Sequence, residues 1–140
     1  MKINLLKQNI TKITISNNSV IKDAIKVIQE NTERACFVID KKNNLIASIS
    51  DGDIRRGLLK GYSLKDNVSK IYNSKFNFLQ KGYSIDSAYK KFAGKINILP
   101  IVDEYGKFQG AIRKHDLVPF LDIKSKKILV VGLGYVGLTL

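Results

Sequence analysis

The sequence predicts an α+β fold made of two β-α-β-β-α units in tandem. Residues 35–54 and 98–117 align without a gap at a spacing of 63 residues, and an internal repeat outranks any single motif when a fold is inferred. Short apolar runs bounded by polar turns alternate with segments whose apolar residues recur at helical spacing. The 140 residues suffice for one or two small domains with a packed core.

The repeat is clearest where a predicted strand passes into a predicted helix. The strand end Val38-Ile39-Asp40 has its counterpart in Ile101-Val102-Asp103, and residues 49–54 have theirs in residues 112–117. Further upstream, residues 20–25 resemble residues 84–89, one residue out of register. The whole unit is therefore repeated, because the matching segments keep the same order.

The first unit is expected to contain three strands and two helices. The residues before Asn17 predict a lead-in and a short strand in which Ile13 and Ile15 share one face. Gly61 is expected to end the second helix. The expected elements are a strand within residues 9–15, a helix over 20–31, strands over 35–39 and 45–49, and a helix over 51–59.

The second unit is expected to follow a linker over residues 62–75 that contains one helical turn, at residues 67–71. Ser84 is predicted to cap its first helix, and Pro100 is expected at a sheet edge or strand start because it lacks an N–H. The expected elements are strands over residues 76–79, 98–102 and 108–112, with helices over 84–92 and 113–121.

The charge balance bears on the class of partner. A net charge of +12 favours polyanionic partners in general. The lysines are scattered without a long basic run, however, so nucleic acid is not the partner we expect. No apolar run approaches the roughly 20 residues that span a bilayer, and the first residues lack the apolar core of a signal peptide. Together with a single cysteine, these features predict a cytoplasmic protein that does not bind a membrane.

The corner around Ser50 gathers groups that suit a nucleotide. Ser50 and Asp51 can cap the helix that follows, and the free N–H groups of a helix start bind phosphate. The carboxylate of Asp53 suits ribose hydroxyls, because it only accepts hydrogen bonds and can serve two hydroxyls at once. Arg55 and Arg56 follow, but adjacent helical residues point about 100° apart, so both cannot face one phosphate. A capped surface helix with an acidic first turn is the alternative interpretation.

No catalytic or metal centre is predicted. His115 is the only histidine, and it has no clustered cysteine or histidine beside it. Cys36 lies inside an apolar run and is expected to be a buried thiol. Neither a Ser/His/Asp nor a Cys/His arrangement can therefore be assembled.

Over about residues 6–122 the sequence resembles a tandem cystathionine-β-synthase (CBS) domain pair, the Bateman module. The resemblance lies in the order of elements, in the paired strand ends and in the run Ser50-Asp51-Gly52-Asp53-Ile54-Arg55-Arg56-Gly57-Leu58-Leu59. The resemblance implies ligand sensing rather than catalysis, pseudo-twofold packing of the two repeats, and a homodimer formed through the CBS helices. The run is most similar to modules attached to enzymes of sugar-phosphate and nucleotide-sugar metabolism.

The resemblance also implies where a ligand binds. CBS pairs commonly bind adenosine-containing ligands through a Ser or Thr followed three residues later by Asp, and Ser50 and Asp53 match this pattern. In the second repeat Asp116 is kept, but Arg113 replaces the hydroxyl, where it could contact a phosphate or block the cleft. We therefore expect one competent site more readily than two, with Arg56 near the phosphate. The expected ligand is AMP, ADP or ATP, its base lying near the backbone of Ile13 and Thr14 and bonded by backbone groups of residues 13–15.

The last segment differs in kind from the repeats. An apolar run over residues 128–131 leads into Gly132, Gly134 and Gly137, the Gly-x-Gly-x-x-Gly fingerprint of dinucleotide-binding folds. It resembles the first strand and turn of the Rossmann domain of the UDP-glucose/GDP-mannose dehydrogenase family, which binds NAD. The rest of such a domain lies outside this sequence, so NAD is expected only in a longer parent protein. An adventitious apolar end is the alternative.

These observations define the predicted organisation. The first CBS repeat spans residues 1–61, the linker and second repeat span 62–122, and a partial Rossmann-like segment spans 123–140. The predicted function is a regulatory pair that controls an attached enzyme. The alternative is the N-terminal part of an NAD-dependent nucleotide-sugar dehydrogenase in which the CBS pair only forms the dimer.

Overall fold

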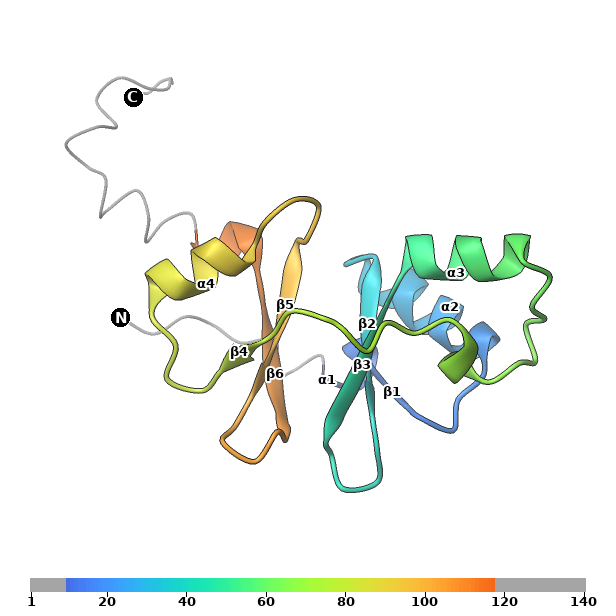
Figure 1. The fold of residues 1–140 in the computed structure, drawn as a ribbon, viewed down its shortest axis with the longest axis horizontal. Coiled ribbons are helices and arrows are strands. Elements are labelled where there is room, and N and C mark those ends of the chain that lie inside the picture. Colours follow the sequence, from blue (N-terminus) through green and yellow to red (C-terminus); the bar gives the residue numbers. More distant parts are fainter. Residues whose placement is uncertain (1–9, 118–140) are drawn as a thin grey trace, which may run out of the picture.

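The computed structural model of the chain describes residues 10–117, which form two three-stranded sheets that face each other (Figure 1). In the first repeat α2 and α3 cover the outer face of one sheet, and in the second α4 covers the outer face of the other. The elements of the first repeat are α1 (Ile10–Ile13), β1 (Thr14–Ser16), α2 (Ile21–Asn31), β2 (Ala35–Ile39), β3 (Leu45–Ser50) and α3 (Asp51–Leu59). Those of the second are η2 (Val68–Lys70), β4 (Leu79–Gln80), α4 (Ile85–Lys91), β5 (Ile98–Val102) and β6 (Phe108–Arg113), followed by helical residues 114–117.

The two sheets have the same topology, which confirms the predicted α+β fold of two β-α-β-β-α repeats. In each sheet the first two strands are parallel and the last two form an antiparallel hairpin. Each hairpin has a register shift at an equivalent place, between Val38 and Ile39 and between Ile101 and Val102. The duplicated sequence therefore specifies duplicated irregularities as well as duplicated strands.

The two hairpins meet at their tips through a reciprocal pair of backbone hydrogen bonds. The N–H of Leu45 donates to the carbonyl of Gly106 at 3.1 Å, and the N–H of Phe108 donates to the carbonyl of Asn43 at 2.9 Å. Each bond is the image of the other under exchange of the repeats. The two repeats are thus related by an approximate twofold axis at the tips.

A hydrophobic cluster between the sheets joins the repeats. It holds residues from both halves of the chain, and the rings of Phe37 and Phe108 lie 6.1 Å apart between centroids. The buried members of the cluster are Ile13, Phe37, Ile98, Phe108 and Ala111. Burial of these side chains stabilises the association of the two sheets, since it removes apolar area from water.

The linker after α3 packs back onto the first repeat. Val68 is fully buried and, with Ile71, belongs to the core under α2. The N–H of Val68 donates to the carbonyl of Ser19, and the carbonyl of Asp66 accepts from Ile21. Further along, Asn73 pairs with Ser48 at the edge of β3. The helical turn predicted in the linker is the 3-10 helix η2.

Pro100 lies in the central strand of its sheet, so the expectation of an edge or strand start was wrong. It pairs with Ala111 of β6 and is fully buried. The sheet of the second repeat lacks one strand pair at this proline, which has no N–H to donate. β1 pairs at Phe37, Val38 and Ile39, whereas β4 pairs only at Ile101 and Val102, and the absent pair is the one at Pro100. Instead of the strand predicted over residues 76–79, the structure has the two-residue strand β4 at Leu79–Gln80.

The expectation that Ile13 and Ile15 share one strand face was also wrong. Ile13 ends the helical turn α1, and β1 begins at Thr14. Ile13 packs into the cluster between the repeats, whereas Ile15 packs into the core under α2. In this turn, just before β1, the carbonyl of Lys12 accepts a hydrogen bond from the side-chain amide of Asn31 at 2.9 Å.

Candidate functional site

The first candidate corner lies where β3 ends at Ser50 and α3 begins. The hydroxyl of Ser50 accepts from the N–H of Asp53 at 3.2 Å. The Oδ2 atom of Asp53 accepts from the N–H of Ser50 at 2.9 Å and from its hydroxyl at 3.0 Å. This reciprocal pattern is a capping box, and it holds the two predicted ligand-binding side chains in direct contact.

Arg56 completes the first corner. Its Nη2 atom donates to Oδ1 of Asp53 at 2.8 Å, with the arginine side chain 66% exposed and the aspartate 17% exposed. Arg55 is exposed to solvent, as expected of one of the two adjacent arginines. The guanidinium group of Arg56 lies over the start of the helix, since a Cβ atom added at Gly52 would lie 3.1 Å from Nη1. Both carboxylate oxygens of Asp53 are therefore occupied, one by the cap and one by Arg56.

β1 lies in the same sheet as Ser50. Thr14 pairs with Phe37 of β2, and Ala35 at the start of β2 pairs with Ser50. The side-chain amide of Asn31 donates to the carbonyls of both Lys12 and Ala35 at 2.9 Å. Asn31 thus fixes the lead-in backbone at the end of the sheet that carries the corner. Sequence reasoning missed this role, because a polar residue at the end of a helix carries no signal for it.

The side chain of Ile13 is 1% exposed and cannot itself contact a ligand without repacking. Thr14 is half-buried. The predicted role of both residues is to bind the base of the ligand through their backbone. Their position two strands away from Ser50 in the same sheet is compatible with that role, which stays a prediction.

The second candidate corner lies where β6 ends at Arg113. Its Nε and Nη2 atoms donate to Oδ2 and Oδ1 of Asp116, both at 3.2 Å. The N–H of Arg113 also donates to Oδ2 of Asp116 at 3.2 Å, so Asp116 occupies the same capping position as Asp53. The hydrogen bond to Asp116 is the main reason that the pKa of Arg113 is raised. The two corners have the same backbone and different side chains.

A residue of the first repeat reaches this second corner. Oε2 of Glu33, in the connection between α2 and β2, lies 3.6 Å from Nη1 of Arg113. The second corner therefore faces the first repeat, and by the twofold relation the first corner faces the second. Sequence reasoning did not single out Glu33, because its partner is 80 positions away in the other repeat.

Cys36 is fully buried next to the first corner, as expected of a core thiol. Burial raises its pKa to about 12, and the nearby charge of Asp53 adds to the shift. A thiol with so high a pKa is protonated and unreactive at neutral pH. It therefore contributes packing to the corner and no nucleophile.

Residues 10–117 contain neither a metal-binding cluster nor a membrane-spanning helix. His115 is exposed and lies 3.5 Å from Asp116, and no group of three or more possible ligands forms among these residues. No described helix has the length and apolar character needed to cross a bilayer. The glycines Gly132, Gly134 and Gly137, predicted to bind NAD only in a longer parent protein, lie outside the described residues.

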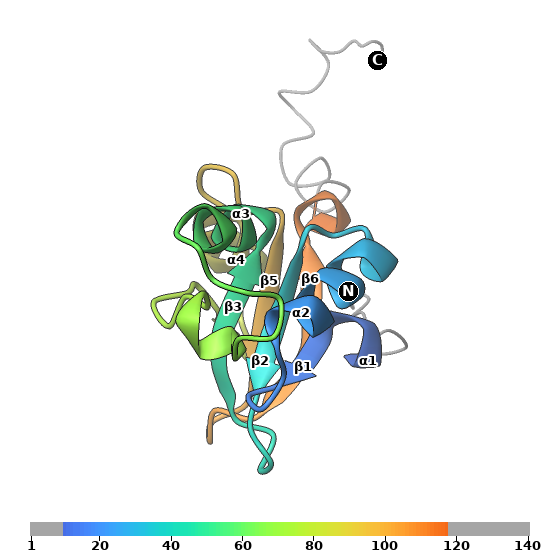
Figure 2. The ribbon, with the colours of Figure 1, turned by 90° about the vertical axis from the view of Figure 1, so that its right-hand side faces the viewer.

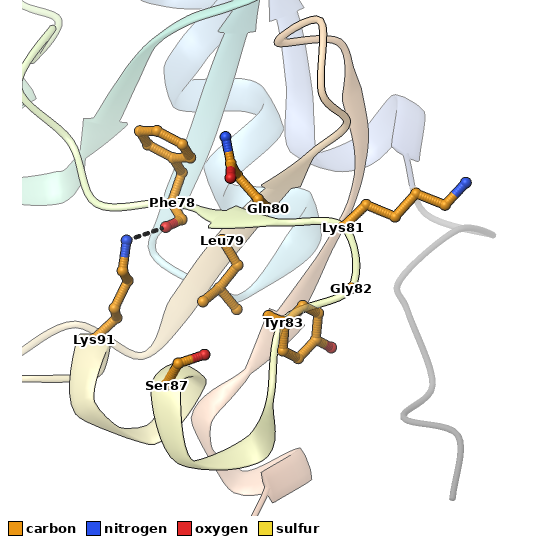
Figure 3. Close-up of a pocket in the computed structure, with 8 residues that line it drawn as sticks. All are labelled: Phe78, Leu79, Gln80, Lys81, Gly82, Tyr83, Ser87 and Lys91. Carbon is orange, nitrogen blue, oxygen red and sulfur yellow. Dashed lines mark hydrogen bonds between the residues drawn. The ribbon is translucent and has the colours of Figure 1, made fainter.

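A groove of about 390 Å³ lies in the second repeat between residues 78–83 and α4 (Figure 3). Lys91 crosses it, donating to the carbonyl of Phe78 at 2.9 Å. Burial raises the pKa of Tyr83 on its wall, and the charge of Asp116 adds to this. The lining residues are Phe78, Leu79, Gln80, Lys81, Gly82, Tyr83, Ser87 and Lys91. None of them was predicted as a site residue.

Comparison with known families identifies the class of protein. The CBS domain family matches residues 8–60 and 68–122. The chain belongs to this family, and the two matched segments make it a tandem CBS pair.

The chain spans about a third or less of the length of the curated relatives it matches. An uncharacterized protein of Helicobacter pylori is 29% identical over 120 residues, which cover 84% of this chain and 36% of the relative. Inosine-5'-monophosphate dehydrogenase of Aquifex aeolicus is 29% identical over 112 residues, which cover 78% of this chain and 22% of the relative. Arabinose 5-phosphate isomerase GutQ of Shigella flexneri is 34% identical over 80 residues, covering 56% and 25%.

Solved structures share the fold. A CBS domain protein from Pyrobaculum aerophilum complexed with AMP superposes with a TM-score of 0.69 at 17% identity, covering 81% of this chain and 91% of that one. CBSX2 in complex with AMP has a TM-score of 0.65 at 21% identity, covering 79% and 88%. The cytosolic domain of the Mg²⁺ channel MgtE in complex with ATP has a TM-score of 0.65 at 17% identity, covering 77% and 44%.

Proposed function

We propose that this CBS pair is a regulatory module that binds an adenine nucleotide at the first corner. The observation that carries the proposal is the contact between Ser50 and Asp53, which places a hydroxyl, a carboxylate and the N-terminus of α3 together. Structures of the same fold have been determined with AMP and with ATP. The proposal rests on this similarity and on the match of the two residues to the CBS pattern.

Binding would exchange partners on one carboxylate. Oδ2 of Asp53 is held by the cap, whereas among the described residues Oδ1 accepts only from Arg56, whose long side chain is mostly exposed. The ribose hydroxyls would replace Arg56 on Oδ1, and the released guanidinium group would reach the phosphate. The carboxylate would keep its charge-assisted hydrogen bonds, and the arginine would gain a phosphate, to which it binds well. The base would lie toward the backbone of residues 13–15.

The test is calorimetric titration of the chain with AMP, ADP and ATP. Asp53→Asn keeps a cap acceptor but removes the charge, and we expect it to weaken binding by about 10- to 100-fold, the usual cost of losing hydrogen bonds to a charged group. Asp51→Asn is the matched control, because Asp51 is an exposed acid in the same helix turn. Equal affinity of the Asp53→Asn protein and the wild type would refute the site.

A homodimer through α3 and α4 is the second part of the proposal. Both helices lie on the same flank of the pair (Figures 1 and 2). Leu58 and Leu59 of α3 are 41% and 81% exposed, and Tyr89 of α4 is 47% exposed. Burial of these apolar side chains between two copies would stabilise a dimer.

Analytical ultracentrifugation tests the dimer. We expect Leu59→Glu to shift the chain to monomer, because it would place a charge in the contact. Tyr105→Glu is the control, since Tyr105 is 75% exposed at a hairpin tip away from these helices. A monomeric wild type, or a dimer that both variants leave intact, would count against this interface.

Control of an attached enzyme is the third part. CBS segments match parts of an arabinose 5-phosphate isomerase and an inosine-5'-monophosphate dehydrogenase. The Gly132, Gly134 and Gly137 pattern favours an NAD-dependent nucleotide-sugar dehydrogenase in a chain that continues beyond Leu140. NAD-linked oxidation of UDP-sugars by such a longer chain would test this, and its absence would leave only the CBS pair's own role.

A further inference from the structure

The second corner contains a cation of its own where the first contains a hydroxyl. Arg113 takes the place of Ser50 in the repeat, and its guanidinium group binds both oxygens of Asp116. In the first corner, within residues 10–117, the carboxylate oxygen Oδ1 of Asp53 accepts only from the exposed side chain of Arg56. In the second corner a partly buried arginine, 33% exposed, holds the whole carboxylate.

The same guanidinium group also bridges the two repeats. One edge, Nε and Nη2, faces Asp116, and the remaining Nη1 lies 3.6 Å from Oε2 of Glu33. The carboxylates of Asp116 and Glu33 are only 16% and 20% exposed. A planar guanidinium fork suits two carboxylates at once, because its five N–H donors are fixed in direction. A ligand that binds Asp116 would have to displace Nε and Nη2 of Arg113 from its two oxygens.

The charge of Arg113 is balanced by neighbouring groups of the protein. Its guanidinium group faces the carboxylates of Asp116 and Glu33, and Lys114 and the exposed His115 stand at the helix start beside it. Arg113 therefore has its charge already compensated by protein groups. A phosphate would have to compete with two carboxylates for the same guanidinium group.

We propose that Arg113 is a built-in occupant of the second nucleotide corner, which leaves one nucleotide site per chain and turns the second corner into a tie between the repeats. The count of one site rests on the proposed function, whereas the tie does not. A serine at position 113 would restore the Ser-x-x-Asp pattern and free Asp116. The residue thus determines whether the second corner accepts a ligand.

Stoichiometry tests the occupant. Titration of the wild type with AMP should give one site per chain, and titration of Arg113→Ser should give two. Arg55→Ser is the matched control, because it removes one arginine from an exposed position and should leave one site. In the Asp53→Asn/Arg113→Ser protein the single remaining site should disappear when Asp116→Asn is added. Circular dichroism verifies that each variant is folded.

The outcomes separate this proposal from the proposed function. One site in both the wild type and Arg113→Ser would overturn the occupant and leave the first-corner function intact. Two sites in the wild type would overturn it as well. Binding by Arg113→Ser alone, abolished by Asp116→Asn, would support the occupant and overturn the first-corner function.

Thermal unfolding tests the tie without any nucleotide. Glu33→Gln should lower the Tm of the wild type and should have a smaller effect in an Arg113→Gln background, because the partner is already gone. The Tm difference caused by Glu33→Gln should also shrink at high salt. Equal effects of Glu33→Gln in both backgrounds would overturn the tie.

Discussion

The two CBS repeats have the same strands and helices but differ in what covers them. In the first repeat the linker packs over the start of α2 and buries Val68 against the sheet. The second repeat instead has the groove of about 390 Å³ lined by residues 78–83 and by Ser87 and Lys91 of α4. A duplicated unit thus keeps its backbone, while the connection between the copies makes their surroundings unequal.

The corners show the same inequality in their side chains. Equivalent backbone bonds hold both: the N–H of Asp51 donates to Arg34, and the N–H of Lys114 donates to Asn97, 63 residues further on in each case. Onto this shared frame the first repeat places a serine and the second places Arg113. The two copies therefore differ in single side chains at a common geometry.

The largest expected effect concerns Val68, the linker residue buried in the core of the first repeat. Val68→Ala would remove two methyl groups from a site with no exposed surface and leave a cavity beneath α2. We expect a loss of about 2 kcal/mol in the free energy of unfolding, measured by urea denaturation. Ser87→Ala on the exposed wall of the second groove should change it by less than about 0.5 kcal/mol. Similar losses of unfolding free energy in Val68→Ala and Ser87→Ala would contradict the expected difference between the two repeats.

A smaller effect is expected at the helix caps. Ser50→Ala removes the acceptor for the N–H of Asp53, and Ser84→Ala removes the acceptor for the N–H of Ser87. Each should cost about 1 kcal/mol, with Ser50→Ala the more costly because its hydroxyl also binds the carboxylate of Asp53. Urea denaturation of both single variants and of the double variant measures the free energy of unfolding. A larger loss for Ser84→Ala than for Ser50→Ala would mean that the capping box of Ser50 and Asp53 adds no stability.

The smallest effect is expected at the hairpin tips. Asn43 has a φ of 67°, and its counterpart Gly106 has a φ of 81°. Asn43→Gly would relieve a left-handed conformation but lose the side-chain hydrogen bond to the carbonyl of Phe108. The two effects oppose each other, so the free energy of unfolding, measured by urea denaturation, should change by less than about 0.5 kcal/mol. Asn43→Ala, which keeps the strain and loses the bond, should be clearly worse.

Much of this molecule could be predicted from its sequence. Ser50 as a helix cap follows from local rules that need no tertiary context, and the repeat at a spacing of 63 residues gives the tandem fold. The role of Glu33 could not be predicted, because it depends on how one repeat faces the other. Pro100 departs from the usual preference of its residue type, since β4 accommodates it by losing a pair while β5 stays central. The role of Asn31 depends on the path of the chain before β1.

The tips and the corners stand at opposite ends of the same strands. The six residues of β3 span about 20 Å, with two backbone hydrogen bonds between the repeats at one end and the ion pair of Glu33 and Arg113 at the other. The two repeats are therefore joined at both ends of these strands as well as through the hydrophobic cluster between the sheets. A rotation of about 3° at the tips would move a corner by about 1 Å over this length, enough to break or restore a hydrogen bond.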